Sequence, residues 1–113
     1  MVTRYVPDAG DLVWLTFDPQ SGVEQAGRRP ALVLSPRAYN GLTGLAVMCP
    51  VTSKSKRYAL EVALPEGDSV SGVVLSDHLK SLDWRARKVV FASAAPATVL
   101  AEVRARVKTL LGV

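Results

Sequence analysis

The segment LAVMCPVT, residues 45–52, decides which class of fold the chain can form. It is apolar up to Val51 and lacks the alternation between apolar and polar side chains that marks a strand with one wet face. A strand of this kind is buried on both faces. The segment therefore predicts the central strand of a sheet.

Other short segments predict further strands around it. They are rich in Val and Leu and are bounded by Gly, Pro, Asp or Asn. They cover residues 11–17, 31–35, 59–64, 72–76 and 88–93. Leu60, Val62 and Leu64 alternate with Glu61 and Ala63, which is typical of a strand with one solvent-exposed face. We expect a mixed, strongly curved sheet.

The end of the chain has a different period. From Pro96 to Leu111 the apolar residues recur at intervals of three and four, which predicts an amphipathic helix. Pro96 suits the first turn of this helix, and Gly112 suits the position after the last turn. The predicted architecture is mainly β: a small barrel of about six strands with one C-terminal amphipathic α-helix packed against it.

With 113 residues and a formal charge of +4, the chain is expected to form a single domain, residues 1–113, of a soluble protein. A chain of this length can bury roughly 65% of its unfolded surface without disulfides or metal. The single Cys49 has no partner for a disulfide, which suits the reducing cytoplasm. No segment approaches the roughly 18 to 20 apolar residues that span a membrane, and Arg4 and Asp8 stand where a signal peptide would be apolar.

Charge is distributed along the chain in blocks. Residues 1–27 carry −3, residues 28–57 carry +6, residues 58–83 carry −4 and residues 84–113 carry +5. Such blocks can fold into a basic face that suits a polyanion or an acidic peptide. The alternative is charge scattered over the surface for solubility.

The polar connection at residues 18–30 carries residues suited to phosphate chemistry. Glu24, Arg28 and Arg29 lie close together in it. A carboxylate can accept the proton of an RNA 2′-hydroxyl, and a guanidinium can stabilise the charge that develops on the phosphate. Such a pair can cleave RNA without a metal. A surface ion pair is the structural alternative.

A second polar connection follows the central strand. Thr52 and Ser53 supply hydroxyls there, and Lys54, Lys56 and Arg57 follow them. This set could hold phosphates. The alternative is an ordinary polar turn in which Thr52 satisfies a backbone group.

Three aromatic residues lie near these connections. Trp14 shares a strand face with Leu12, so it is expected in the core. Phe17, at the strand end, is the expected platform for stacking a base, and Trp84 could serve the core or a groove.

One His and one Cys make no zinc site, and His78 alone cannot support a two-histidine ribonuclease mechanism.

Several motifs follow one another in a fixed order. They are GDLVW (10–14), FDP (17–19), EQAGRRP (24–30), VLSP (33–36), PVTS (50–53), GVVLSD (72–77) and KSLDWRAR (80–87). Together they cover most of the chain, and a terminal helix follows them. In this combination the sequence resembles the MazF/PemK family of toxin endoribonucleases.

The resemblance implies an SH3-like barrel of the CcdB/PemK type and a homodimeric toxin of a type II toxin-antitoxin pair. Members of the family cleave single-stranded RNA, chiefly messenger RNA, at a short sequence. They leave 2′,3′-cyclic phosphate and 5′-hydroxyl ends and need no metal, cofactor or ribosome. A cognate antitoxin with an acidic C-terminal tail blocks the RNA groove, and the complex binds DNA. The resemblance thus implies a cytoplasmic protein that arrests growth and has no membrane partner.

The resemblance also implies roles for individual residues. Carried over by motif position, Glu24 would act as general base and Thr52 would hold the scissile phosphate. Arg29 would stabilise the transition state, with protonation of the leaving oxygen as a second role. The RNA contacts are expected to come from Phe17, Gln25, Arg28, Ser53, Lys54, Lys56, Asp77, His78, Lys80 and Arg87.

Two rival functions are compatible with the same fold. CcdB-like toxins have this barrel, bind DNA gyrase and catalyse nothing. The combination of Glu24, Arg29 and Thr52 favours the nuclease over this alternative. A catalytically inactive protein that binds nucleic acid or sequesters antitoxin would bind RNA in a salt-dependent way and yield no product.

Overall fold

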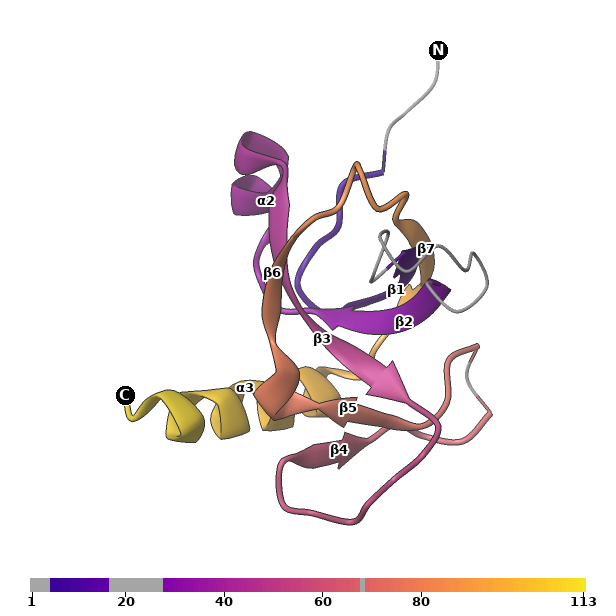
Figure 1. Cartoon of the computed structure of the whole chain (residues 1–113), viewed down its shortest axis with the longest axis vertical. Helices are drawn as coiled ribbons and strands as arrows, with labels where there is room; N and C mark the ends of the chain where they lie inside the picture. Colours follow the sequence, from indigo (N-terminus) through magenta and orange to yellow (C-terminus); the bar gives the residue numbers. More distant parts are fainter. Residues whose placement is uncertain (1–4, 17–27, 68) are drawn as a thin grey trace.

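The computed structural model describes residues 5–16, 28–67 and 69–113 of the chain. Within these residues seven strands form one sheet (Figure 1). They are β1 (Asp11–Thr16), β2 (Arg28–Val33), β3 (Leu45–Thr52), β4 (Glu61–Ala63), β5 (Val73–Leu75), β6 (Lys80–Asp83) and β7 (Val90–Ala94). Their order is β4-β5-β3-β2-β1-β7, and β6 pairs with β3 off this path. The sheet curls without closing, since β4 and β7 stand at its two ends.

The predicted fold class, mainly β with a C-terminal helix, is confirmed, but three details differ. Every strand pair is antiparallel, so the prediction of a mixed sheet is wrong. The sheet is open where a barrel was expected. It also has one strand more than the six predicted segments, because β6 pairs with β3 although only Leu82 of its four residues is buried.

β3 is the central strand, as its apolar sequence predicts. It pairs with β6 through residues 45–48, with β2 through 48–50 and with β5 through 51–52. Its side chains alternate between two hydrophobic cores, with Cys49 and Val51 in one and Ala46 and Met48 in the other. Because successive side chains of a strand point to opposite faces, the two cores lie on opposite faces of the sheet.

The helix α3 (Ala97–Leu111) covers the first of these cores, the one that contains Cys49. Val99 and Val103, one helical turn apart, are buried against the sheet. Gly112 ends the helix with a left-handed φ of 74°. α3 packs against β4 and the short 3-10 turn η1 (Ser76–His78), at the lower end of Figure 1. No helix in the described part of the chain is long and apolar enough to cross a bilayer.

α2 (Arg37–Thr43) is a short helix that the sequence does not predict. It contains Gly41 and has no side-chain cap at its N-terminus. Asn40 holds it instead. The buried Asn40 amide donates to the carbonyl oxygens of Pro7 (2.8 Å) and Ser35 (2.9 Å) and accepts from the Ser35 hydroxyl (2.6 Å). The indole N–H of Trp84 donates to the Asn40 carbonyl at 3.0 Å, which places Trp84 in the core.

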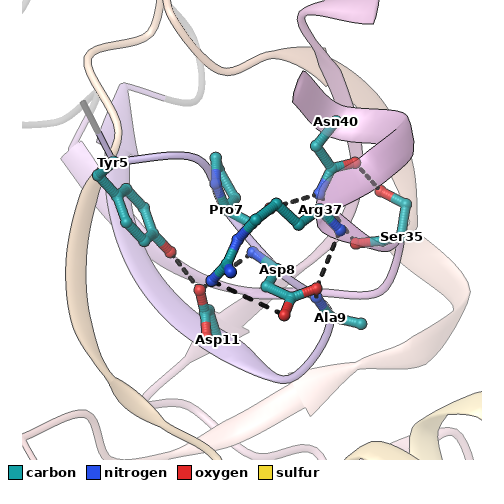
Figure 2. A network of polar contacts seen from close by, with 8 residues as sticks. All are labelled: Tyr5, Pro7, Asp8, Ala9, Asp11, Ser35, Arg37 and Asn40. Atoms are coloured by element: carbon teal, nitrogen blue, oxygen red, sulfur yellow. Dashed lines mark hydrogen bonds and ion pairs between the residues drawn. The ribbon is translucent and has the colours of Figure 1, made fainter. Parts of the chain in front are cut away.

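The same network ties down the N-terminal segment (Figure 2). The Asp8 carboxylate accepts from the backbone N–H of Arg37 at 2.9 Å and lies 3.8 Å from its guanidinium. That backbone hydrogen bond is the main reason why the pKa of Asp8 is lowered. The Tyr5 hydroxyl donates to Asp11, and burial together with this bond raises the pKa of Tyr5. Residues 5–11 are therefore held by α2 as well as by β1.

Cys49 is expected to resist thiol reagents while the protein is folded. The side chain is fully buried, and burial, with a smaller effect of Asp77, raises the pKa of its thiol to about 12. The reactive thiolate is therefore scarce at pH 8 and lies out of reach. Titration with an aromatic disulfide reagent should detect one thiol only after denaturant is added. A folded protein that reacts as fast as free cysteine would contradict the buried position of Cys49.

Candidate active site

β1, β2 and β3 lie side by side, and their register determines which side chains meet at one end of the sheet. Leu15 lies opposite Arg29, and Ala31 lies opposite Pro50. The β2–β3 register ends at this second pair, and Arg29 and Thr52 lie two positions beyond it on their strands. A cleft of about 380 Å³ opens at this position. It is lined by Trp14, Arg29, Pro30, Val51, Thr52, Ser53, Ser69, Val70 and Ser71.

The cleft combines one cation with several hydroxyl groups. The Arg29 side chain is exposed, Thr52 is half-buried, and the serines of the lining are exposed. A guanidinium is a planar donor fork that matches two oxygens of a phosphate, and hydroxyls add single donors. The described residues that line the cleft include no acid. This lining therefore favours an anion.

Thr52 ends β3 with a local turn. Its Oγ1 accepts a hydrogen bond from the backbone N–H of Lys54 at 3.2 Å. This contact matches the sequence alternative in which Thr52 satisfies a backbone group. It occupies an oxygen lone pair, so the hydroxyl hydrogen can still be donated into the cleft. The turn and a contact with an anion are thus compatible.

Gly72 allows the chain before β5 to approach this wall of the cleft. Its φ of +119° lies in a region that side chains disfavour, and a Cβ atom there would overlap the carbonyl oxygen of Thr52 and lie 2.9 Å from its carbonyl carbon. Both obstacles are backbone atoms, which cannot rotate away. Glycine is therefore required at this position for Thr52 to keep its place.

The substitution Gly72→Ala is expected to lower the free energy of unfolding by about 1 to 3 kcal/mol and to displace Thr52. Thermal unfolding measures the first effect, and the rate of the RNA cleavage that the sequence resemblance implies measures the second. Gly67→Ala is the matched control, because Gly67 also has a positive φ (+92°) but has nothing within 4 Å of an added Cβ. Equal losses in the two variants would contradict a specific contact with Thr52.

Trp14 lines the cleft, with 38% of its surface exposed, so the expectation that it packs in the core is wrong. The alternation of β1 does place Trp14 on the same face as Leu12. Leu12 belongs to the core beneath α3, however, and that core does not extend as far as Trp14. The indole ring is left at the surface, where the cleft opens.

Three residues with predicted roles lie outside the described residues. They are Glu24, the expected general base, and Phe17 and Gln25, the expected RNA contacts. Their roles therefore stay predictions.

Comparison with known proteins identifies the family of the chain. Residues 8–111 match the family described as PemK-like, MazF-like toxin of type II toxin-antitoxin system. The chain belongs to the PemK/MazF toxin family. It is 47% identical over 112 residues to the endoribonuclease toxin MazF of Escherichia coli (strain K12), an alignment that covers 99% of this chain and 100% of the relative.

Solved PemK/MazF structures show the same fold. The crystal structure of MazF (Form-I) from Deinococcus radiodurans matches with a TM-score of 0.89 at 64% identity, covering 97% of this chain and 100% of that one. A MazE-MazF crystal structure (Form-II) from the same organism matches with a TM-score of 0.87 at 60% identity, covering 96% and 98% of the two chains.

Arg28 and Arg87 are not brought into the cleft of this PemK/MazF chain. Arg28 Nη1 donates to the carbonyl oxygens of Lys88 (3.0 Å) and Arg87 (3.3 Å). Arg87 Nη1 donates to the carbonyl oxygen of Thr16 at 3.2 Å. Both guanidinium groups join the ends of β1 and β2 to the turn before β7. The structure thus gives these two arginines structural contacts, and their RNA contacts stay predictions.

The basic loop that follows Thr52 is folded around one carboxylate. Glu61 accepts hydrogen bonds from the Ser55 hydroxyl (2.6 Å) and from the backbone N–H groups of Lys56 (2.8 Å) and Arg57 (3.1 Å). The Ser55 hydroxyl, followed by the Lys56 N–H, holds the pKa of Glu61 below its usual range. Lys54 and Lys56, predicted to contact RNA, are exposed, and Lys54 directly follows Ser53 of the cleft lining.

The remaining predicted RNA contacts lie on η1 and β6, outside the cleft lining. Asp77 accepts a hydrogen bond from the Tyr58 hydroxyl at 2.7 Å, and this bond is the main cause that raises the pKa of Tyr58 to about 12. His78 Nε2 lies 3.8 Å from Asp77 Oδ1. Lys80 is exposed at the start of β6, opposite Met48. The Tyr58 bond therefore joins Asp77 to the basic loop.

Sequence reasoning missed two polar residues of the cleft, Ser69 and Ser71. A signal was present, because both precede Gly72, and a glycine between short strands can mark a close backbone approach.

No group of three or more His, Cys, Asp or Glu side chains that could hold a metal occurs within residues 5–16, 28–67 and 69–113.

Proposed function

We propose that this PemK/MazF chain, as one toxin domain over residues 1–113, is a sequence-specific endoribonuclease that cleaves single-stranded messenger RNA. The reaction needs neither a metal nor the ribosome, and it arrests growth in the cytoplasm. The observation that carries the proposal is the cleft that brings Arg29 and Thr52 together. The curated relatives are named endoribonucleases, which supports the same reaction class.

The contents of the cleft support binding of a phosphodiester. The Arg29 guanidinium can bind two phosphate oxygens at once, and Thr52 and Ser53 can each donate one hydrogen bond to the same group. The exposed ring of Trp14 offers a face on which a neighbouring base can stack, which every base tolerates. The cleft thus suits one nucleotide of an unpaired strand better than a base-paired duplex.

The proposed reaction proceeds by internal attack on phosphorus. The 2′-oxygen forms a bond to phosphorus while its proton passes to Glu24, and the bond between phosphorus and the 5′-oxygen breaks. Arg29 stabilises the negative charge on the equatorial oxygens. It also passes a proton to the leaving 5′-oxygen and recovers a proton from solvent, so that the step balances. The products are a 2′,3′-cyclic phosphate and a 5′-hydroxyl. Thr52 holds the scissile phosphate in place during the exchange.

The partners proposed are a second copy of the chain and a cognate antitoxin with an acidic tail. Solved neighbours include MazE-MazF structures, which supports an antitoxin. An acidic tail and RNA would compete for the same positive surface, so antitoxin binding would block cleavage. The complex of the two proteins is proposed to bind DNA.

Cleavage of a long RNA in excess EDTA tests the proposal. Purified protein is incubated with a single-stranded RNA, and products are mapped by primer extension and by end-group analysis. Discrete cuts at a recurring short sequence, with cyclic phosphate ends, are expected. An Arg29→Ala sample prepared in parallel identifies any contaminating nuclease.

Two other outcomes would overturn the proposal. A folded protein that neither binds nor cuts RNA would favour a CcdB-like toxin, for which DNA gyrase binding is the next assay. Salt-dependent RNA binding without any product would indicate a catalytically inactive nucleic-acid-binding protein.

A further inference from the structure

Glu61 is an acid that directly follows a basic loop. It opens β4, directly after the loop of residues 53–60 that contains Lys54, Lys56 and Arg57. From charge alone, Glu61 should weaken the binding of RNA to the neighbouring basic side chains, because its negative charge reduces the positive potential of the loop. The geometry of its contacts favours the opposite effect, in which Glu61 strengthens the binding of RNA.

Glu61 hydrogen-bonds to Ser55 and to the backbone of the loop, and it attracts the Lys56 side chain without forming an ion pair with it. Its two carboxylate oxygens accept from the Ser55 hydroxyl (2.6 Å) and from the N–H groups of Lys56 (2.8 Å) and Arg57 (3.1 Å). Successive N–H groups that converge on one anion form a nest. Among the described residues, no acid forms an ion pair with the side chains of Lys54, Lys56 or Arg57.

The carboxylate also stabilises an unfavourable backbone conformation. Arg57 has a φ of 56°, in the left-handed region that residues other than glycine seldom adopt. Its N–H group donates both to Glu61 and to the Ser55 hydroxyl (3.1 Å). Without these acceptors the loop would lose the contacts that hold Arg57 in this strained conformation.

The loop is fixed at two further points. Next to the cleft, the Lys54 N–H donates to Thr52 Oγ1 at 3.2 Å, and at the other end the Tyr58 hydroxyl donates to Asp77 at 2.7 Å. Glu61 bonds to the stretch between these points, where Lys56 and Arg57 lie. The three basic side chains are thus held on one ordered loop that continues directly from a wall of the cleft.

We propose that Glu61 is a positioning residue for RNA: it orders residues 53–58 so that Lys54, Lys56 and Arg57 bind the phosphates that flank the nucleotide in the cleft. This rests on the proposed endoribonuclease function. An ordered loop loses less conformational freedom when RNA binds, so the cations contribute more to affinity than they would on a mobile loop. Glu61 acts through these residues and does not touch the reacting atoms.

The substitution Glu61→Gln gives a test in which the two effects have opposite signs. It raises the formal net charge from +4 to +5, so charge alone predicts tighter RNA binding. Loss of positioning predicts weaker binding. The backbone N–H groups of Lys56 and Arg57 donate to different carboxylate oxygens, and an amide keeps only one accepting oxygen, so at least one of these N–H groups loses its acceptor. Glu66→Gln is the matched control, since Glu66 is an exposed acid in the turn after β4 and the substitution makes the same change in charge.

RNA binding is measured by fluorescence anisotropy with a mixed-sequence 12-nucleotide RNA that carries 2′-O-methyl groups and cannot be cleaved. We expect Glu61→Gln to weaken binding about tenfold, or about 1.4 kcal/mol, and Glu66→Gln to weaken it not at all. In cleavage assays the loss should fall on KM, with kcat within about twofold. The slope of log K against log salt should become shallower by about 2 if three phosphate contacts are lost.

Limited digestion with trypsin tests the order of the loop without RNA, because Lys54, Lys56 and Arg57 are all trypsin sites. We expect the native protein to be cut slowly there and Glu61→Gln to be cut much faster, at an unchanged Tm. If the native protein binds no RNA while the digestion result holds, the endoribonuclease proposal fails and Glu61 only shapes the loop. If Glu61→Gln binds RNA as tightly as Glu66→Gln, the positioning role is overturned.

Discussion

Replacing Arg29 with Ala is expected to slow RNA cleavage by about 10²- to 10³-fold, the usual cost of removing one group that stabilises a charged transition state. The negative charge on the phosphorane oxygens has no other cation among the described residues that line the cleft. Arg29 is exposed, so its loss should change the free energy of unfolding by no more than about 0.5 kcal/mol. Single-turnover cleavage and thermal unfolding measure the two effects.

Two further variants make the Arg29 result specific. Arg29→Lys keeps the charge but loses the planar fork, so an intermediate rate is expected. Arg85→Ala removes an equal charge from a guanidinium that lies 4.8 Å above the Trp84 ring and does not line the cleft. It should cleave at nearly the native rate. A similar loss in Arg85→Ala and Arg29→Ala would show that only net charge matters.

The substitution Asn40→Ala is expected to lower the free energy of unfolding by about 3 kcal/mol or more. It would leave the carbonyl oxygens of Pro7 and Ser35 without their donor in a buried site, and each such loss costs about 1 to 3 kcal/mol. That is a large share of the roughly 5 to 15 kcal/mol that stabilises a domain. Differential scanning calorimetry should show a Tm lower by about 10 to 15 °C.

Leu42 provides the control for Asn40 on the same helix. Its side chain is 87% exposed, so Leu42→Ala should alter stability by no more than about 0.5 kcal/mol. If the two variants unfold at the same temperature, the network in Figure 2 does not hold α2 and the N-terminal segment in the way described.

The sequence predicts those parts of the fold that depend on hydrophobic pattern. β3 is a continuous apolar run and α3 has an amphipathic helical period, and both are found where they were expected. β6 and α2 lack such a pattern. Only Leu82 is buried in β6, which depends on pairing with β3, and α2 depends on the long-range bonds of Asn40. Elements of this kind are set by tertiary contacts, which a local pattern cannot reveal.

The candidate site, like the fold, could be predicted from the sequence only in part. Motif order led to Arg29 and Thr52, and the register of β2 and β3 brings them into one cleft. Alternation placed Trp14 on the correct face of β1 but could not show how far α3 covers that face. For Arg28 the sequence predicted an RNA contact. Its guanidinium instead donates to the backbone of residues 87 and 88, and these residues are too distant in sequence for a local pattern to reveal the contact.

The pairing of Asp11 with Ala94 joins β1 near the start of the chain to β7 near its end. A chain that stops before β7 lacks both the partner of β1 and the helix that supplies Val99 and Val103 to the core. In genetic terms, a stop codon late in the reading frame is as damaging as an early one. Nonsense alleles that abolish toxicity are therefore expected along nearly the whole gene, up to the last turns of α3.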